Sequence, residues 1–162
     1  MNSKASREPG LANIEHLNIV VYTTTSLLEA LRQCDLARYP ALRSLSIEIV
    51  YDTVDSSRVV DVWRSILAVL RSIPATTALE HLTLTSPVPL AALCSGWSRS
   101  ALVAVLQQPL YSIDHCLVRI VDRAPLEHVT VVPPQGETFF SSNWARVRSF
   151  FRALYDYDML RY

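Results

Sequence analysis

The sequence predicts an α/β solenoid in which about four parallel strands form one face and helices form the other. A six-residue phrase with apolar first, fourth and sixth positions occurs four times in the chain. Between the copies the apolar period changes from two residues to about 3.6, which is typical of strands that alternate with helices. The apolar residues of all four copies have the same parity, so they would point to one side of a sheet.

The four copies mark the predicted strands: IEHLNI (14–19), LRSLSI (42–47), LEHLTL (79–84) and LEHVTV (126–131). Their spacing is irregular, so the additional residues must lie between them. We expect these side chains to point inward: Leu17, Ile19, Val21, Leu45, Ile47, Ile49, Leu82, Leu84, Val129 and Val131. The opposite, solvent-facing side would carry His16, Asn18, Val20, Ser44, Ser46, Glu48, His81, Thr83, Thr85, His128, Thr130 and Val132. A doubly wound sheet shares the element order, but its strands would be apolar on both faces, so the alternation favours the one-sided sheet.

Helices are predicted after the first and second strands. Ser26 and Glu29 can form a capping box, and Leu27, Ala30, Leu31 and Cys34 follow at helical spacing. Asp55 or Ser56 can cap the second helix, which Pro74 would end. The apolar stripe of that second helix is Val59, Val62, Trp63, Ile66, Val69, Leu70 and Ile73.

The third and fourth intervals differ from the first two. A Pro- and Ser-rich loop leads to a short helix near 100–108 that should end at Pro109. A second helix near 112–123 has Ile113, Cys116, Leu117 and Ile120 as its stripe. After the fourth strand a PPQGE turn precedes a capping helix at about 142–159. We therefore expect a polar lead at 1–10 and a single domain over 11–162, with a loop and helix insertion at about 86–111.

Composition excludes several classes of function. The 162 residues include 15 basic and 15 acidic side chains, so we expect neither nucleic acid nor a membrane surface as a partner, because both attract a net positive charge. Three separated cysteines and no apolar leader predict an intracellular chain, cytoplasmic or nuclear. Only three glycines occur, without the spacing of a phosphate loop, and no hydrolase motif is present, so neither an enzyme nor a cofactor is expected.

The phrases ARYPALRSLSIEI, RSIPATTALEHLTL and VRIVDRAPLEHVTVV carry a resemblance. The L-x-x-L-x-L pattern with intervening helices resembles leucine-rich repeats. More narrowly, it resembles the degenerate repeats of the F-box and leucine-rich-repeat-like proteins of mushroom-forming fungi, over about residues 11 to 160. The resemblance implies a protein-protein recognition domain, the substrate-binding part of a ubiquitin-ligase receptor. The alternative is a standalone or truncated relative with no ubiquitin role.

The sequence departs from these families in two respects. The ninth repeat position, where the standard residue is Asn or Cys, holds Tyr22, Val50, Pro87 and Pro134. No F-box is recognisable, because Leu-Pro-x-Glu followed by paired helices is absent from the N-terminal region. The element that would dock on the ligase adaptor is therefore missing from the pattern.

The Glu-His pairs that begin three of the strands invite a chemical interpretation. Neighbouring residues of a strand point to opposite faces, so a Glu and the His beside it would not form an acid-base dyad. In adjacent strands His81 and His128 could share a metal ion, but two ligands do not make a zinc site. We therefore predict no metal centre, and the histidines would fill a solvent-facing repeat position.

The polar, nearly uncharged sheet face is the candidate binding surface for an unidentified protein partner. Its alternative is a solvated sheet surface. The residues expected to contact the partner are His16, Ser44, Ser46, Glu48, His81, Thr83, His128 and Thr130, with Trp97 at the margin.

Two C-terminal features are open to structural interpretations. Arg146, Arg148 and Arg152 could contact phosphate, but Asp156 and Asp158 follow, and a solvated helix face explains them better. The C-terminal aromatic residues would cap the end of the solenoid core; alternatively, they would form a groove for a peptide or a second subunit.

Overall fold

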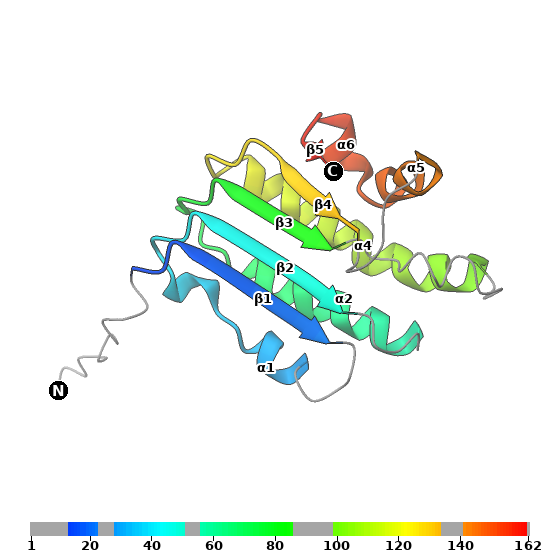
Figure 1. The fold of residues 1–162 in the computed structure, drawn as a ribbon, viewed down its shortest axis with the longest axis horizontal. Helices are drawn as coiled ribbons and strands as arrows, with labels where there is room; N and C mark the ends of the chain where they lie inside the picture. The colour runs from blue at the N-terminus through cyan, green and yellow to red at the C-terminus, as the bar shows by residue number, and fades with distance from the viewer. Residues whose placement is uncertain (1–12, 23–27, 51–55, 86–98, 134–140, 162) are drawn as a thin grey trace.

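Five parallel strands form one sheet in the computed structural model, which describes residues 13–22, 28–50, 56–85, 99–133 and 141–161. The strands lie side by side in chain order (Figure 1): β1 (His16–Tyr22), β2 (Ser44–Val50), β3 (His81–Thr85), β4 (Val129–Val132) and β5 (Leu160–Arg161). Each neighbouring pair is parallel. The predicted α/β class with parallel strands is confirmed, with one strand more than expected.

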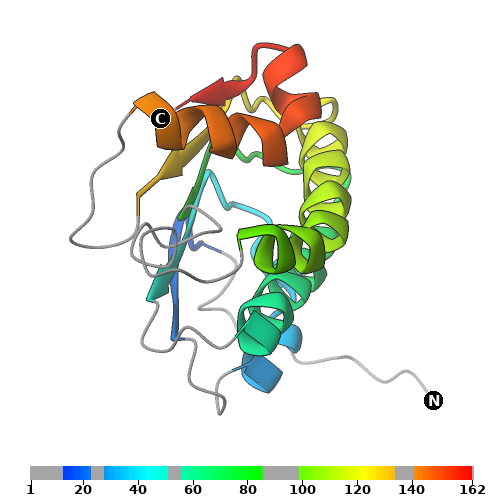
Figure 2. The same cartoon turned by 90° about the vertical axis from the view of Figure 1, so that its right-hand side faces the viewer.

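Helices alternate with these strands and form a second layer. They are α1 (Leu28–Arg32), the 3-10 helix η1 (Leu36–Arg38), α2 (Ser56–Arg71), α4 (Arg99–Val121), α5 (Ser141–Phe150) and α6 (Arg152–Asp156). Viewed along the sheet, α1, α2 and α4 lie on the same side of the strands (Figure 2). α2 packs against α1 and α4, and α4 packs against α5 and α6. No helix in the described part of the chain is both long and apolar enough to cross a bilayer.

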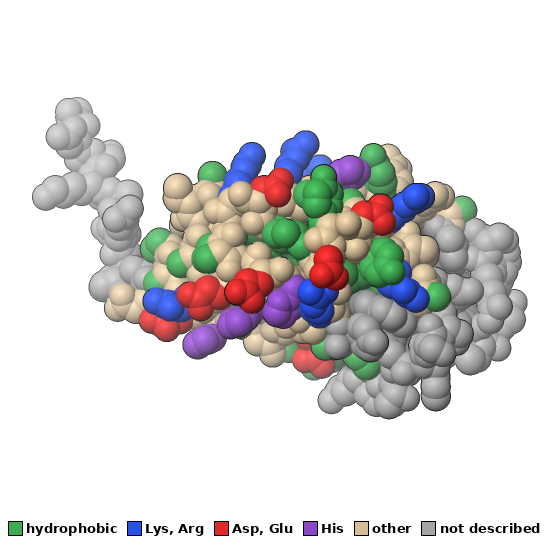
Figure 3. Space-filling view, turned by 90° about the horizontal axis from the view of Figure 1, so that it is seen from above, with side chains coloured by type: hydrophobic (Ala, Val, Ile, Leu, Met, Phe, Trp, Pro, Cys, Tyr) green, Lys and Arg blue, Asp and Glu red, His purple; other side chains and the backbone are tan. Residues whose placement is uncertain are grey.

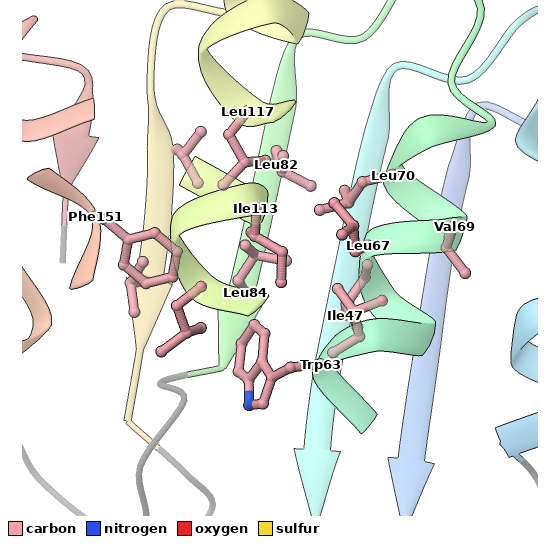
Figure 4. Packing of buried hydrophobic residues seen from close by; sticks show 14 of the residues in the cluster. Ile47, Trp63, Leu67, Val69, Leu70, Leu82, Leu84, Ile113, Leu117 and Phe151 are labelled. Carbon is pink, nitrogen blue, oxygen red and sulfur yellow. The ribbon is translucent and has the colours of Figure 1, made fainter. Parts of the chain in front are cut away.

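The core lies between the two layers, as the parity of the strands predicts. Apolar residues of α2 and α4, including Trp63, Leu70, Ile113 and Leu117, pack over the strand residues (Figure 4). The strand residues beneath them are at most 1 % exposed: Leu45, Ile47, Ile49, Leu82, Leu84, Val129 and Val131. All the predicted inward residues of β2, β3 and β4 are therefore buried.

β1 is less well covered than the other strands. Leu17 and Ile19 are paired in register with Leu45 and Ile47 but are only partly buried, while Val21 is 2 % exposed. β1 pairs with β2 alone among the described strands, so it has a neighbour on one side only. The apolar side chains of β1 therefore point inward as predicted, but they are less completely buried than those of β2, β3 and β4.

The second helix follows its prediction closely. α2 ends at Arg71, shortly before Pro74. Ile73 packs at the margin of the core. The remaining stripe residues are at most 2 % exposed: Val59, Val62, Trp63, Ile66, Val69 and Leu70.

The first helix is confirmed only in part. α1 begins at Leu28, and the predicted cap Ser26 and the predicted stripe residue Leu27 lie outside the described residues. Leu31 is buried and Cys34 partly so, but Ala30 is exposed, contrary to prediction. The buried face is defined by Leu28 and Leu31, and Ala30 lies about 200° around the helix from Leu28.

The 3-10 helix η1 was not predicted. Its first turn is fixed by two side-chain acceptors: an Asp35 carboxylate oxygen accepts from Ala37 N at 3.1 Å, and Ser72 Oγ accepts from Leu36 N at 2.8 Å. Ser72 lies just after α2, so this contact joins the connection before β2 to the end of the neighbouring helix.

The expected helix break at Pro109 is wrong. α4 runs without interruption from Arg99 to Val121, with Pro109 inside it. Leu106 and Leu110 on either side of the proline are fully buried, and the stripe continues through Ile113 and Leu117. A proline inside a helix costs about 3 kcal/mol, whereas burying four such side chains contributes about 6 to 12 kcal/mol. The continuous buried stripe therefore outweighs the local preference.

The single capping helix expected at about 142–159 is also wrong. The chain instead forms α5 and α6, separated at Phe151, and then β5. Phe151 is fully buried, and Asp158 takes a left-handed conformation with φ of 58°, which ends the helical segment. Met159 O then accepts from Val129 N at 2.7 Å, so the returning chain adds β5 to the sheet.

The two faces of β2 provide a direct test of the one-sided core. Ile47→Ala should lower the free energy of unfolding by about 2 to 5 kcal/mol, because it removes buried side-chain volume. Ser46→Ala, one residue away on the open face, should change it by less than about 0.5 kcal/mol. Urea unfolding followed by circular dichroism measures both values, and similar losses for the two variants would contradict a sheet covered on one side.

Candidate functional site

The open face of the sheet brings the predicted contact residues together in rows. His16 pairs in register with Ser44, and Ser44 with His81. His128 directly precedes Val129, which pairs with Leu82, so it continues the same row. Figure 3 shows histidine side chains lined up on one side of the molecule. The predicted row at the start of the strands is thus present in the structure.

A second row crosses the middle of the sheet. It consists of Asn18, Ser46, Thr83, Thr130 and Arg161, each paired with the next. Because β5 was not predicted, Arg161 is an addition to the expected face. The row offers amide and hydroxyl groups over four strands and a guanidinium group on the fifth.

The expected contact residues are accessible to different degrees. His16 and His81 are exposed, while Ser44, Ser46, Glu48, Thr83, His128 and Thr130 are partly buried. Trp97 lies outside the described residues. Eight of the nine expected residues are therefore placed on one face by the described part of the chain.

Several polar side chains on this face make no hydrogen bond or ion pair within the described residues. Within the described ranges no hydrogen bond or ion pair involves the side chains of Ser46, Glu48, Thr83 or Thr130. Thr85 differs, because it is 1 % exposed and its hydroxyl oxygen accepts from Ile49 N at 3.0 Å. Thr85 was expected on the open face, and its burial removes it from the accessible surface.

The glutamates beside the histidines hold the strand ends together. Glu15 O accepts from Arg43 N at 2.8 Å and Ser44 N at 2.9 Å, and Glu80 N donates to Arg43 O at 2.8 Å. The Glu80 carboxylate also forms an ion pair with Arg43 at 3.1 Å. Among the described residues no three His, Cys, Asp or Glu side chains are grouped as they would be around a metal ion.

Two hollows on the helix layer were not predicted. One, of about 410 Å³, lies between α4 and the α5–α6 segment; its lining includes Gln107, Tyr111, Asp114, Arg152 and Asp156. The other, of about 400 Å³, lies between the end of α2 and α4 and is lined by Arg71, Tyr111, Ser112, His115, Cys116 and Arg119.

The outward residues of α4 could have been found in the sequence. Tyr111, His115 and Arg119 follow at intervals of four, and Ile113 and Leu117 form the opposite, buried stripe. The contribution of Arg71 could not have been found in the sequence, because it depends on how α2 packs beside α4.

Asp114, on α4, is a buried acidic side chain of the helix layer and is 3 % exposed. Its carboxylate accepts from Ala153 N at 2.7 Å and from Leu154 N at 3.1 Å. These are first-turn N–H groups of α6, whose own N-cap residue Phe151 provides no side-chain acceptor. Burial raises the pKa of Asp114, and the two backbone hydrogen bonds oppose that rise. Asp114 therefore caps α6 from a different helix.

Comparison with known protein families, with curated proteins and with solved structures gave no significant match. The class that the structure defines is an α/β fold in which an all-parallel five-stranded sheet alternates with helices.

Removing the Asp114 cap should destabilise the fold. Asp114→Ala leaves two N–H groups of α6 without an acceptor and should lower the free energy of unfolding by about 1 to 2 kcal/mol. Asp122→Ala removes an exposed carboxylate just after α4, the helix that contains Asp114, and should lower the free energy of unfolding by less than about 0.5 kcal/mol. Urea unfolding at neutral pH compares the two variants, and equal losses would refute the capping role.

The raised pKa of Asp114 gives its effect on stability a definite direction. A carboxyl group whose folded-state pKa lies above its unfolded value of about 3.9 binds protons more tightly when folded, so its contribution becomes less favourable as pH rises. Compared with Asp114→Asn, the wild type should therefore gain stability as pH falls from about 7 toward about 4. Unfolding measured across that range tests the sign, and a relative gain for the variant at low pH would contradict it.

Proposed function

We propose that this chain is a leucine-rich-repeat-like solenoid domain that binds a protein partner through the open face of its sheet, without bond chemistry. The observation that carries the proposal is the polar face of a parallel sheet that packs α1, α2 and α4 on its other face, within the described part of the chain. Parallel sheets are usually covered on both faces, so an accessible one is unusual and needs a reason. Repeat proteins that bind through exposed strands supply that reason.

The chemistry of the face supports a protein partner. Ser46, Thr83 and Thr130 stand in one row with hydroxyl groups that make no hydrogen bond within the described residues. Such groups can donate to and accept from a partner's backbone or side chains, and aligned strands hold them at a fixed spacing of about 4.8 Å. Few charged side chains occupy the face, so recognition would depend on shape and hydrogen bonding.

The resemblance to F-box-associated repeats extends this proposal. It suggests that the partner is a protein destined for ubiquitination and that this domain supplies the recognition step. The resemblance alone supports that extension.

A pair of acidic substitutions on the open face tests the proposed function. Ser46→Glu with His81→Glu places two carboxylates where the partner would dock, and burying them unpaired should weaken binding at least tenfold. Ala68→Glu with Ala104→Glu adds the same charge at exposed positions of α2 and α4 and is the matched control. Proximity labelling in the native cell, with each variant at equal abundance, measures how strongly each neighbouring protein is labelled.

The control decides how the result is interpreted. A protein that is labelled by the wild type and by the control variant, but not by the sheet-face variant, would support the proposal. An unchanged set of neighbours in that variant, or an equal loss in both, would reject the open face as the binding surface. Circular dichroism and thermal unfolding of both variants establish that each remains folded.

A further inference from the structure

We propose that the hollow between the end of α2 and the outer side of α4 binds a phosphate monoester dianion. We call it the two-arginine hollow; it has a volume of about 400 Å³ and the lining residues Arg71, Tyr111, Ser112, His115, Cys116 and Arg119. It belongs to the helix layer and does not depend on the function proposed for the sheet.

Two arginines from different helices converge on this hollow. Arg71 is the last residue of α2, and Arg119 lies in the last turn of α4. Both are exposed, while Cys116 between them is partly buried. Burial raises the pKa of the Cys116 thiol, and both guanidinium groups act to lower it. All three side chains line the same hollow.

These two arginines lack the carboxylate partner that several other described arginines have. Five described arginines form ion pairs with N–O distances of 3.1 to 3.7 Å: Arg32, Arg43, Arg64, Arg152 and Arg161. Within the described part of the chain, neither Arg71 nor Arg119 has a carboxylate within 4.0 Å, and no acidic residue lines the hollow. Two nearby positive charges repel each other, so a dianion between them would relieve that repulsion.

The adjacent hollow shows the contrast. It shares Tyr111 and His115 with the two-arginine hollow, but its Arg152 already pairs with Asp156 at 3.7 Å. Its other carboxylate, Asp114, accepts two backbone N–H groups. The positive charge of that hollow is therefore neutralised within the protein.

Further donors surround the two guanidinium groups. Tyr111 and His115 are one helical turn apart, and their rings meet edge to face with centroids 4.3 Å apart, which orients the imidazole. The Ser112 hydroxyl donates to Gln108 O at 3.2 Å, so it is already engaged. We therefore assign the main contacts to Arg71, Arg119 and His115. Each arginine can donate two parallel hydrogen bonds to phosphate oxygens, and the charge of a dianion matches the two arginines better than a carboxylate does.

Calorimetric titration at low ionic strength with inorganic phosphate tests the site. Arg71→Gln and Arg119→Gln should each weaken binding at least about tenfold, because each removes a charge-assisted pair of hydrogen bonds. Arg64→Gln, also on α2 but outside the hollow, removes the same charge and should retain wild-type affinity. No measurable binding to the wild type, or equal weakening in all three variants, would overturn the proposal.

The source of the phosphate is distinguished by two further titrations. O-phosphoserine represents a free small ester, and a seven-residue phosphoserine peptide represents a modified protein. Tighter binding of the peptide would identify a phosphorylated protein as the source. Equal binding of both would identify a small phosphate ester.

Cys116 provides a readout that needs no substitution. Phosphate in the two-arginine hollow should slow alkylation of Cys116 by iodoacetamide, as followed by peptide mass spectrometry. Cys34 is also partly buried with a raised pKa but lies outside the hollow, so its rate should not change. Equal protection of both thiols, or of neither, would count against binding at this site.

Discussion

The alternation of apolar and polar residues along parallel strands is the constraint on which this structure depends. Ile47, Leu84 and Val131 lie on the packed side, and their neighbours Ser46, Thr83 and Thr130 on the other. A slip of one residue in any strand would bury hydroxyl groups and expose aliphatic ones, so the register of each strand is strongly specified. The same alternation that builds the core therefore also places a row of hydrogen-bonding groups on the opposite face.

The two edges of the sheet are stabilised differently. At the β5 edge, Phe151 and Leu154 are fully buried, and Asp114 fixes the start of α6 before the chain returns as β5. At the other edge, Leu17 and Ile19 of β1 remain partly exposed. β1 nonetheless pairs with β2 over seven residues, whereas β4 pairs with β5 over two, so backbone pairing compensates at β1 for the smaller apolar burial.

The sequence determines most of what depends on local periodicity. The strand phrases, the stripe of α2 and the open-face rows could be predicted because each follows from residues two or four positions apart. The predictions that were wrong concern elements whose structure depends on tertiary packing. Pro109 stays within α4 because buried leucines lie on both sides of it, and β5 forms because Asp158 turns the chain back toward Val129. Likewise, Arg71 reaches the outer side of α4 only through the packing of two helices, which no spacing in the sequence encodes.

A net charge of zero conceals an uneven distribution of charge. Most described ion pairs join residues close in sequence, such as Arg64 with Asp61 and Arg161 with Asp158, so these charges cancel locally. The open face is dominated by neutral polar groups, whereas Arg71 and Arg119 concentrate positive charge on the opposite layer. The two proposed binding surfaces therefore differ in chemistry. Binding by hydrogen bonds on the sheet should be little affected by ionic strength, whereas binding by charge attraction at the helices should be strongly affected. The proposed protein contact and the proposed phosphate contact therefore lie on opposite sides of one core and depend on different interactions.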